Sequence, residues 1–320
     1  MRLDVERLAR VPAAMLLAVI VLLALSVVFV ALPPRPHLLH VVQKLGHPSV
    51  FAVIALCVLA LLRRRRAGGP AWRDYPLVLL ACAALGAATE LAQLITHRDP
   101  SVLDVGLDLR GAAAALLLAA AFDHRLYAVR PRAIRGVALA LALGASLAIG
   151  FPLLTAIAAY AHRDRLFPVV FAPGSERDLY FIERGPQRLE LAAADGVSPA
   201  RLRVRLSGLP YAGIVIEEPV ADWRRYLELR VDVGNPTPAP LEFNVRIDDE
   251  VRNFEYDDRY NGAFALAPGE RREIAIPLAT VAAGPRGRAL ELGRIARVVL
   301  FRSGAGGDEF DLYAVRLAGG

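Results

Sequence analysis

The sequence is poor in cysteine and in lysine. Its only cysteines, Cys57 and Cys82, lie in apolar segments of the first half, and the second half has none. A disulfide framework is therefore excluded from the second half, where any domain must fold on its hydrophobic core alone. Of the 38 basic residues only Lys44 is a lysine. A single lysine among so many arginines indicates either a need for a compact ammonium group at this position or chance survival.

Several chemistry-bearing motifs are also missing. The sequence contains no G-x-S-x-G, H-E-x-x-H or P-loop pattern, so it does not indicate the hydrolases, metalloproteases or NTPases that carry them. The net charge of +6 comes largely from arginines that flank apolar segments. This placement is typical of a membrane-topology signal, and no nucleic-acid partner is predicted.

Long apolar segments dominate the first half of the chain. The protein is 55% hydrophobic with a mean hydropathy of +0.40, and about 20 apolar residues cross a bilayer as a helix. The second and fourth segments reach that length only if they include the polar residues Lys44–His47 and Asp104–Asp108. The sequence therefore predicts a membrane all-α helical bundle with five transmembrane helices, at about 11–32, 48–62, 76–95, 105–122 and 133–161.

The basic residues predict how this bundle is oriented. Twelve arginines lie at the N-terminus and in the second and fourth connections, against four basic residues in the first and third connections. Because cytoplasmic loops are enriched in Arg and Lys, the N-terminus is predicted to be cytoplasmic and residues from 162 onward extracytoplasmic, in a multi-pass protein of the bacterial plasma membrane. The run Arg63–Arg66 is expected to anchor the chain to anionic membrane lipids.

Polar residues recur at helical spacing at the outer ends of three of these segments. Each of the three ends carries two polar residues that lie three or four positions apart, which puts both on one helix face. An arginine lies in the loop between two of the pairs. Because a charge in a bilayer costs about 2.5–3.5 kcal/mol, we expect these side chains to face one another in one polar site. They are Lys44, His47, Glu90, Gln93, Arg98, Asp104 and Asp108.

These residues also carry a family resemblance. The stretches "QKLGHPSVF" and "TELAQLITHRDPSVLDVGLDLRGA" resemble the VanZ-like membrane family, whose pattern has Lys and His three apart, Glu-x-x-Gln, an Arg, an Asp, and Asn or Asp four residues later before a Gly, here Gly111. The resemblance covers about residues 10–125. The sequence departs from the family pattern at Gln43, where Asp is usual, and at Pro48, where an aromatic residue is common. Pro48 disfavours helical geometry at His47, so His47 either caps the helix or lies on its face.

The resemblance implies a role in the cell envelope, with glycopeptide antibiotic resistance as the family's namesake, and it implies no defined reaction. The polar site could bind a lipid headgroup or a lipid-linked precursor, with a carboxylate as general base and a cation holding phosphate. The alternative is a salt-bridge network that only fixes helix packing. No catalytic residue and no cofactor is identified, and a divalent cation on the carboxylates is a variant of the binding hypothesis.

The second half of the chain changes from apolar blocks to alternation. Period-two alternation of apolar and polar residues predicts strands, and turn-rich separators such as "GNPTPAP" predict an antiparallel β-sandwich. The predicted strands are 201–207, 226–233, 241–248, 272–278, 296–302 and 310–317. The predicted organisation is a VanZ-like transmembrane domain (1–162), a linker (163–176) and an extracytoplasmic all-β jelly-roll sandwich (177–320).

About residues 180–320 resemble galactose-binding-like jelly-roll domains of the carbohydrate-binding-module type. The order of features carries the resemblance: a Trp-containing turn, a long strand, "DRYN", a Pro-Gly turn and a closing strand that contains an Asp. It implies sugar binding by aromatic faces and planar hydrogen-bonding side chains, although Trp223 and Tyr260 could equally be core residues. The candidates are Trp223, Tyr256, Arg259, Tyr260 and Asn261.

The two halves together predict a cell-envelope-associated integral membrane protein that binds a glycan or a lipid-linked envelope component. One alternative is an intramembrane enzyme that acts on a lipid-linked cell-wall precursor. Another is a non-catalytic membrane scaffold.

Overall fold

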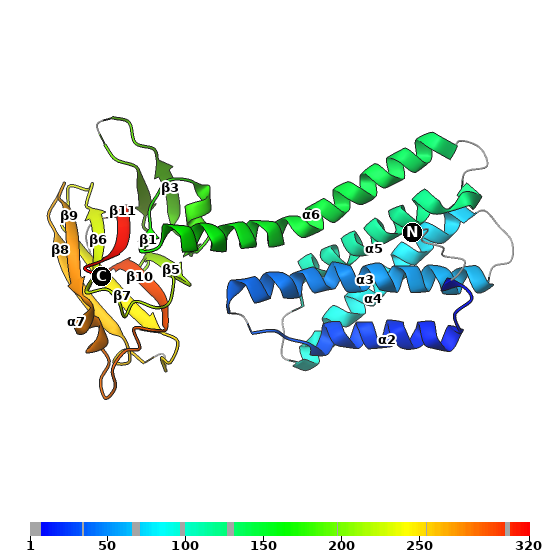
Figure 1. Cartoon of the computed structure of the whole chain (residues 1–320), viewed down its shortest axis with the longest axis horizontal. Coiled ribbons are helices and arrows are strands. Elements are labelled where there is room, and N and C mark those ends of the chain that lie inside the picture. Colours follow the sequence, from blue (N-terminus) through cyan, green and yellow to red (C-terminus); the bar gives the residue numbers. More distant parts are fainter. Residues whose placement is uncertain are drawn as a thin grey trace. The chain divides into compact units, whose positions relative to one another are not determined.

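A computed structural model of the chain describes residues 8–33, 35–65, 71–96, 100–126, 131–196, 198–253, 255–304 and 308–320. These residues form two units, one that ends at Ile157 and one that begins at Ala158. The first unit is helical and the second is a β-sandwich (Figure 1). The change from a helical half to a β half therefore follows the predicted order.

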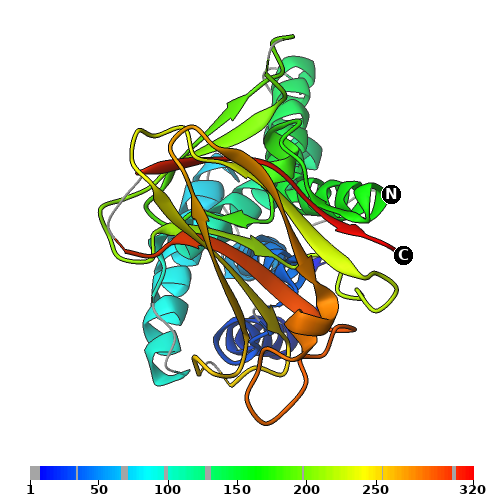
Figure 2. The ribbon, with the colours of Figure 1, turned by 90° about the vertical axis from the view of Figure 1, so that its left-hand side faces the viewer.

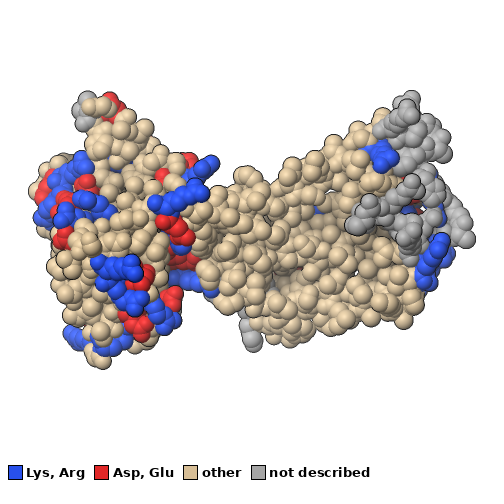
Figure 3. Space-filling view, in the orientation of Figure 1, with Lys and Arg blue, Asp and Glu red and all other residues tan. Residues whose placement is uncertain are grey.

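The helical unit contains α2 (Ala13–Phe29), α3 (His37–Arg65), α4 (Asp74–Gln93), α5 (Val102–Phe122) and the first part of α6 (Pro131–Leu166). Helices α3 to α6 are long and apolar enough to cross a membrane, and α2 is a shorter apolar helix of 17 residues. In the face drawn in Figure 3, charged atoms cover the sandwich but are nearly absent from the helical unit between its ends. Such an uncharged, apolar surface is suited to contact with lipid.

The polar flanks of the second and fourth predicted helices are helical, as expected. Helix α3 runs through Pro48 without a break, and His47 is buried on its face, so His47 is not a cap. Helix α5 begins after Ser101, whose Oγ accepts a hydrogen bond from the backbone N–H of Asp104 at 3.2 Å. A serine at this position and an acidic residue in the first turn both stabilise a helix N-terminus.

Small residues allow α3, α4 and α5 to approach one another. A Cβ atom added at Gly111 of α5 would lie 1.9 Å from the backbone oxygen of Pro48 in α3. A Cβ atom at Gly86 of α4 would lie 3.1 Å from Oδ2 of Asp108. Close approach of backbones at glycine is characteristic of helix packing in membranes. Here it brings polar groups from three helices to the same level of the bundle.

The second unit is a sandwich of two antiparallel sheets, which faces the viewer in Figure 2. One sheet has the order β3-β4-β11-β6-β9 with β1 paired to β11, and the other has the order β2-β5-β10-β7-β8. The strands are β1 (Val169–Phe171), β2 (Ile182–Glu183), β3 (Arg188–Ala192), β4 (Arg201–Arg205), β5 (Gly213–Glu217), β6 (Glu228–Gly234), β7 (Leu241–Asp249), β8 (Tyr260–Leu266), β9 (Arg271–Pro277), β10 (Ile295–Arg302) and β11 (Glu309–Ala318).

Alternation along the strands builds the core between the sheets. In β7, Phe243, Val245 and Ile247 are fully buried, and the residues between them point outward. Each of the six predicted strands coincides with an observed one to within about two residues. The segment predicted as a linker, 163–176, contains the last turn of α6 and β1. The described residues form six α-helices, α2 to α7, where five were predicted, because the sandwich contributes the short α7 (Leu278–Ala282).

Candidate functional site

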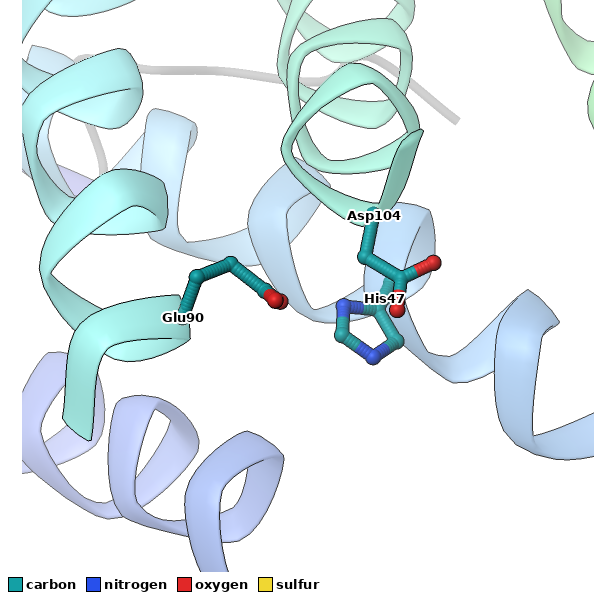
Figure 4. A group of neighbouring side chains, drawn as sticks. All are labelled: His47, Glu90 and Asp104. Carbon is teal, nitrogen blue, oxygen red and sulfur yellow. The ribbon is translucent and has the colours of Figure 1, made fainter. Parts of the chain in front are cut away.

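The helical unit contains a cluster of acidic and imidazole groups. His47 of α3, Glu90 of α4 and Asp108 of α5 have only 5%, 3% and 0% of their surface exposed, and Asp104 of α5 is half-buried. Figure 4 shows Glu90 and Asp104 on either side of the His47 ring. The structure therefore brings together four of the seven residues predicted for the polar site.

Hydrogen bonds hold part of this cluster in place. Nδ1 of His47 lies 3.1 Å from Oδ1 of Asp108, which links α3 to α5. Oε2 of Glu90 accepts a hydrogen bond from the backbone N–H of Ser101 at 2.7 Å. Glu90 thus lies beside the N-terminal end of α5, where the helix dipole favours negative charge.

Three carboxylate oxygens of the cluster remain unsatisfied. Oε1 of Glu90, Oδ1 of Asp104 and Oδ2 of Asp108 are buried, and none has a hydrogen-bond partner among the described residues. A buried polar atom without a partner costs about 1–3 kcal/mol, more when it is charged. One ligand atom each from His47, Glu90 and Asp104 lie within 4.8 Å of one another. These three residues could hold a metal ion.

The other predicted members of the polar site lie elsewhere. Gln93 is buried, and its Nε2 donates to the backbone oxygen of Val27 at 3.3 Å, which joins α4 to α2. Lys44 is exposed, so its ammonium group is not part of the buried cluster. Arg98 lies outside the described residues.

A second buried polar group at the opposite end of the bundle was not predicted. Arg63 donates to Oδ2 of Asp123, and the hydroxyl of Tyr75 donates to the same oxygen at 2.9 Å. The side chains of Arg63 and Asp123 are 5% and 3% exposed. Arg63 is therefore a structural ion-pair residue. The sequence did not indicate this role, because Arg63 lies in a run of arginines that suggested a surface anchor.

The candidates for sugar binding divide into buried and exposed residues. Trp223 has 0% of its surface exposed and donates its indole N–H to the backbone oxygen of Val220 at 2.8 Å, and Tyr260 is also buried. Both rings lie in the core of the sandwich, as the alternative interpretation expected. Tyr256, Arg259 and Asn261 lie together at the surface.

Contacts among these three candidates hold them in position. The Arg259 guanidinium lies 5.1 Å from the centre of the Tyr256 ring, and its Nε donates to Oδ1 of Asn261 at 3.2 Å. Nδ2 of Asn261 donates in turn to the backbone oxygen of Tyr256 at 3.1 Å. The Tyr256 ring is 67% exposed and could stack on a planar or sugar ligand.

These residues border the outer face of the five-stranded sheet, which also carries groups not singled out from the sequence. The register places Asn261 beside Arg246, and Arg246 beside Val299. One step further along the strands, Asn244 lies opposite Phe301. The Phe301 ring makes an edge contact with Tyr211 at 6.1 Å, and Tyr211 is 72% exposed. Aromatic and hydrogen-bonding side chains are thus interleaved on one sheet face.

An ion-pair group lies on the same face. Arg246 donates two hydrogen bonds to Asp248, at 2.8 and 2.9 Å, and Arg297 donates a further one. Burial alone would raise the pKa of Asp248, but the hydrogen bonds from the two arginines outweigh it and hold the pKa below its usual range. Burial and the nearby Arg246 charge lower the pKa of Arg259. Arg297 also lies 3.9 Å from Glu217, so arginines and carboxylates alternate on this face.

No model of a known protein family matches the chain, and no curated protein matches it. The sandwich resembles solved carbohydrate-binding modules at low identity. A family 11 module from Clostridium thermocellum, in complex with a β-1,3-1,4-mixed-linked tetrasaccharide, is 15% identical with a TM-score of 0.34, over 43% of this chain and 86% of that chain. The CBM22-1 xylan-binding domain of Paenibacillus barcinonensis is 16% identical with a TM-score of 0.32, over 48% and 93%. The VanZ-like resemblance of the helical unit has no matching family model.

Proposed function

We propose that this chain is an integral membrane protein of the bacterial cell envelope whose β-sandwich binds a glycan. The observation that carries this proposal is the outer face of the five-stranded sheet, where Tyr211, Tyr256 and Phe301 are interleaved with hydrogen-bonding side chains. Sugar rings have apolar faces that stack on aromatic rings and hydroxyl edges that pair with planar polar groups. Asn244, Arg246 and Asn261 would supply those planar groups.

The helical unit would anchor this face at the membrane. Four helices have the length and composition to cross it, and the basic residues favour a cytoplasmic N-terminus with the sandwich outside. In this proposal the helical unit is VanZ-like, on the strength of the spacing from Lys44 to Gly111. The glycan would therefore be one that the envelope presents close to the outer membrane–water interface.

Binding of the full-length protein to a polysaccharide and glycan array, in detergent or nanodiscs, tests this function. We expect selective binding that falls at least about tenfold in Tyr211→Ala and Tyr256→Ala. The matched control is Tyr313→Ala, which removes a half-buried tyrosine that contacts Arg271 on the other sheet. Binding to no glycan, or equal binding by all three variants, would refute the proposal.

A second function is favoured by one observation in the helical unit. Three unpaired carboxylate oxygens beside a buried histidine are suited to proton transfer during chemistry on a lipid-linked envelope precursor. Such an enzyme should lose turnover of labelled lipid-linked precursor in Glu90→Gln while it remains monodisperse in detergent. A scaffold would instead lose thermal stability in this variant without any turnover to lose.

A further inference from the structure

We propose that the helical unit holds a divalent transition-metal ion between His47, Glu90 and Asp104. The three residues come from α3, α4 and α5, so one ion would cross-link three helices. Figure 4 shows their side chains converging on a common space. The site lies in a different unit from the sugar-binding face, so glycan binding and metal binding can fail independently.

The distances between the three ligand atoms fit a metal ion after a small adjustment of the side chains. The three ligand atoms lie within 4.8 Å of one another, whereas bonds of 2.0–2.2 Å place neighbouring ligands of a tetrahedral zinc site roughly 3.5 Å apart. The atoms would have to close by roughly 1 Å. Rotation of the Glu90 and Asp104 carboxylates can supply this, because Oε1 of Glu90 and Oδ1 of Asp104 have no hydrogen-bond partner among the described residues.

A cation would also remove a cost that the protein otherwise bears. Only 3% of the surface of Glu90 is exposed. Its Oε1 atom has no hydrogen-bond partner among the described residues. The Oδ1 atom of Asp104 is also buried and also has no hydrogen-bond partner among the described residues. Among the described residues, no Lys or Arg forms an ion pair with either carboxylate. A bound cation would supply the counter-charge that these two carboxylates lack among the described residues, where an unpaired buried charge is costly.

Asp108 strengthens the histidine as a ligand. Its Oδ1 lies 3.1 Å from Nδ1 of His47, so it fixes the orientation of the ring. Outer partners of this kind raise ligand basicity, and their loss typically lowers metal affinity 10–100-fold. Gly86 leaves the space that Asp108 occupies, since a Cβ atom there would lie 3.1 Å from Oδ2.

The donor set selects the class of ion. Carboxylates alone suit Mg²⁺ and Ca²⁺, whereas an imidazole among them favours Zn²⁺ and its first-row neighbours. Three protein ligands leave a coordination position open, as in catalytic rather than structural zinc sites. His47, but neither Glu90 nor Asp104, also lines a cavity of about 220 Å³ between α2 and α3, which has room for water.

Metal titration of the full-length protein tests the site. The protein would be purified in detergent through a tag that contains no histidine, stripped with chelator, and titrated calorimetrically with ZnCl₂, MnCl₂ and MgCl₂. We expect about one Zn²⁺ per chain, weaker Mn²⁺ binding and the weakest Mg²⁺ binding. Thermal unfolding should shift upward with Zn²⁺, because a ligand that binds only the folded state stabilises it.

Isosteric variants locate the ion. Glu90→Gln and Asp104→Asn should each lower the Zn²⁺ affinity at least about 100-fold, and Asp108→Asn about 10–100-fold. The control is Asp123→Asn, which removes a buried carboxylate at the other end of the bundle. It should keep the wild-type affinity, and size-exclusion chromatography of each variant checks that the fold survives.

Two results would overturn the metal site. One is a stripped wild-type protein that is monodisperse yet takes up no Zn²⁺ or Mn²⁺ at a defined stoichiometry. The other is Zn²⁺ binding that persists unchanged in Glu90→Gln and Asp104→Asn, which would place the ion elsewhere. Either result leaves the glycan array as an independent measurement of the sandwich.

Discussion

At the scale of single residues, Asp248 shows how burial and charge compete in the sandwich. Its side chain is fully buried, yet its carboxylate stays charged because Arg246 and Arg297 donate hydrogen bonds to it. Removing one partner of a buried ion pair typically costs about 3–5 kcal/mol, and the half-buried arginines reduce that figure through solvent screening. We expect Asp248→Asn to lower the free energy of unfolding of the sandwich by about 2 kcal/mol.

The stability that Asp248→Asn removes should decrease as the pH falls. Since the folded-state pKa of Asp248 lies below the ordinary value of 3.8, the carboxylate contributes its full stability above pH 3.8 and loses it as the pH falls through the folded-state pKa. Thermal unfolding of wild type and Asp248→Asn should therefore differ at pH 7 and converge below pH 3.8. A difference that grows as the pH falls would contradict the lowered pKa.

Trp223 and Tyr256 separate core from surface aromatics. Trp223 is buried and its indole N–H is hydrogen-bonded, so Trp223→Ala should cost about 3–5 kcal/mol of unfolding free energy. Tyr256 is mostly exposed, so Tyr256→Ala should change stability by no more than about 0.5 kcal/mol. Chemical denaturation monitored by circular dichroism compares them. Equal destabilisation would mean that Tyr256 is not free to stack on a ligand.

At the scale of the secondary-structure elements, Gly111 determines how closely α5 approaches α3. An added methyl group would lie 1.9 Å from the backbone oxygen of Pro48, and a backbone atom cannot move aside as a side chain can. We expect Gly111→Ala to separate the two helices and to lower the melting temperature in detergent markedly. Gly106→Ala, on the same helix with nothing within 4 Å of the new atom, is the matched control and should be neutral or slightly stabilising. Equal effects of the two changes would show that close packing at Gly111 is not required.

The sequence predicts elements well where periodicity is strong and poorly where it is weak. The long alternating strands such as β7 and β11 were located, but β5, "GIVIE", was missed because a short apolar run lacks clear alternation. β8 was missed because its outward positions after Asn261 are alanines, so the polar–apolar alternation is weak. α7 is a single turn of five residues that carries no helical period.

The polar cluster shows the same limit in the helical unit. Helical spacing identified His47, Glu90, Asp104 and Asp108, because a bilayer penalises charges that do not meet. Spacing failed for Lys44, which is exposed although it lies three positions from the buried His47. The contact between His47 and Asp108 joins residues 61 apart in sequence, and no local pattern specifies such a pair.

At the scale of the whole molecule, the proposed glycan binding requires a membrane orientation that leaves the sandwich outside the cytoplasm. In a background of Cys57→Ala and Cys82→Ala, which removes the two native thiols, single cysteines would be introduced as Glu190→Cys in β3 and Ala133→Cys at the start of α6. Both positions are exposed. The arginine distribution predicts that a membrane-impermeant maleimide labels Glu190→Cys in intact spheroplasts and Ala133→Cys only after lysis.

The reverse labelling pattern would place the sandwich in the cytosol, where no envelope glycan reaches it, and the proposed function would have to be abandoned whatever the isolated protein binds. Labelling of both positions before lysis would indicate leaky spheroplasts, and a cytosolic marker protein with one exposed cysteine controls for this. The expected pattern would instead give the array result its meaning. A sugar-binding face held outside the membrane by a hydrophobic bundle meets the glycans of the envelope at high local concentration, so even weak stacking on Tyr211 and Tyr256 would suffice for occupancy.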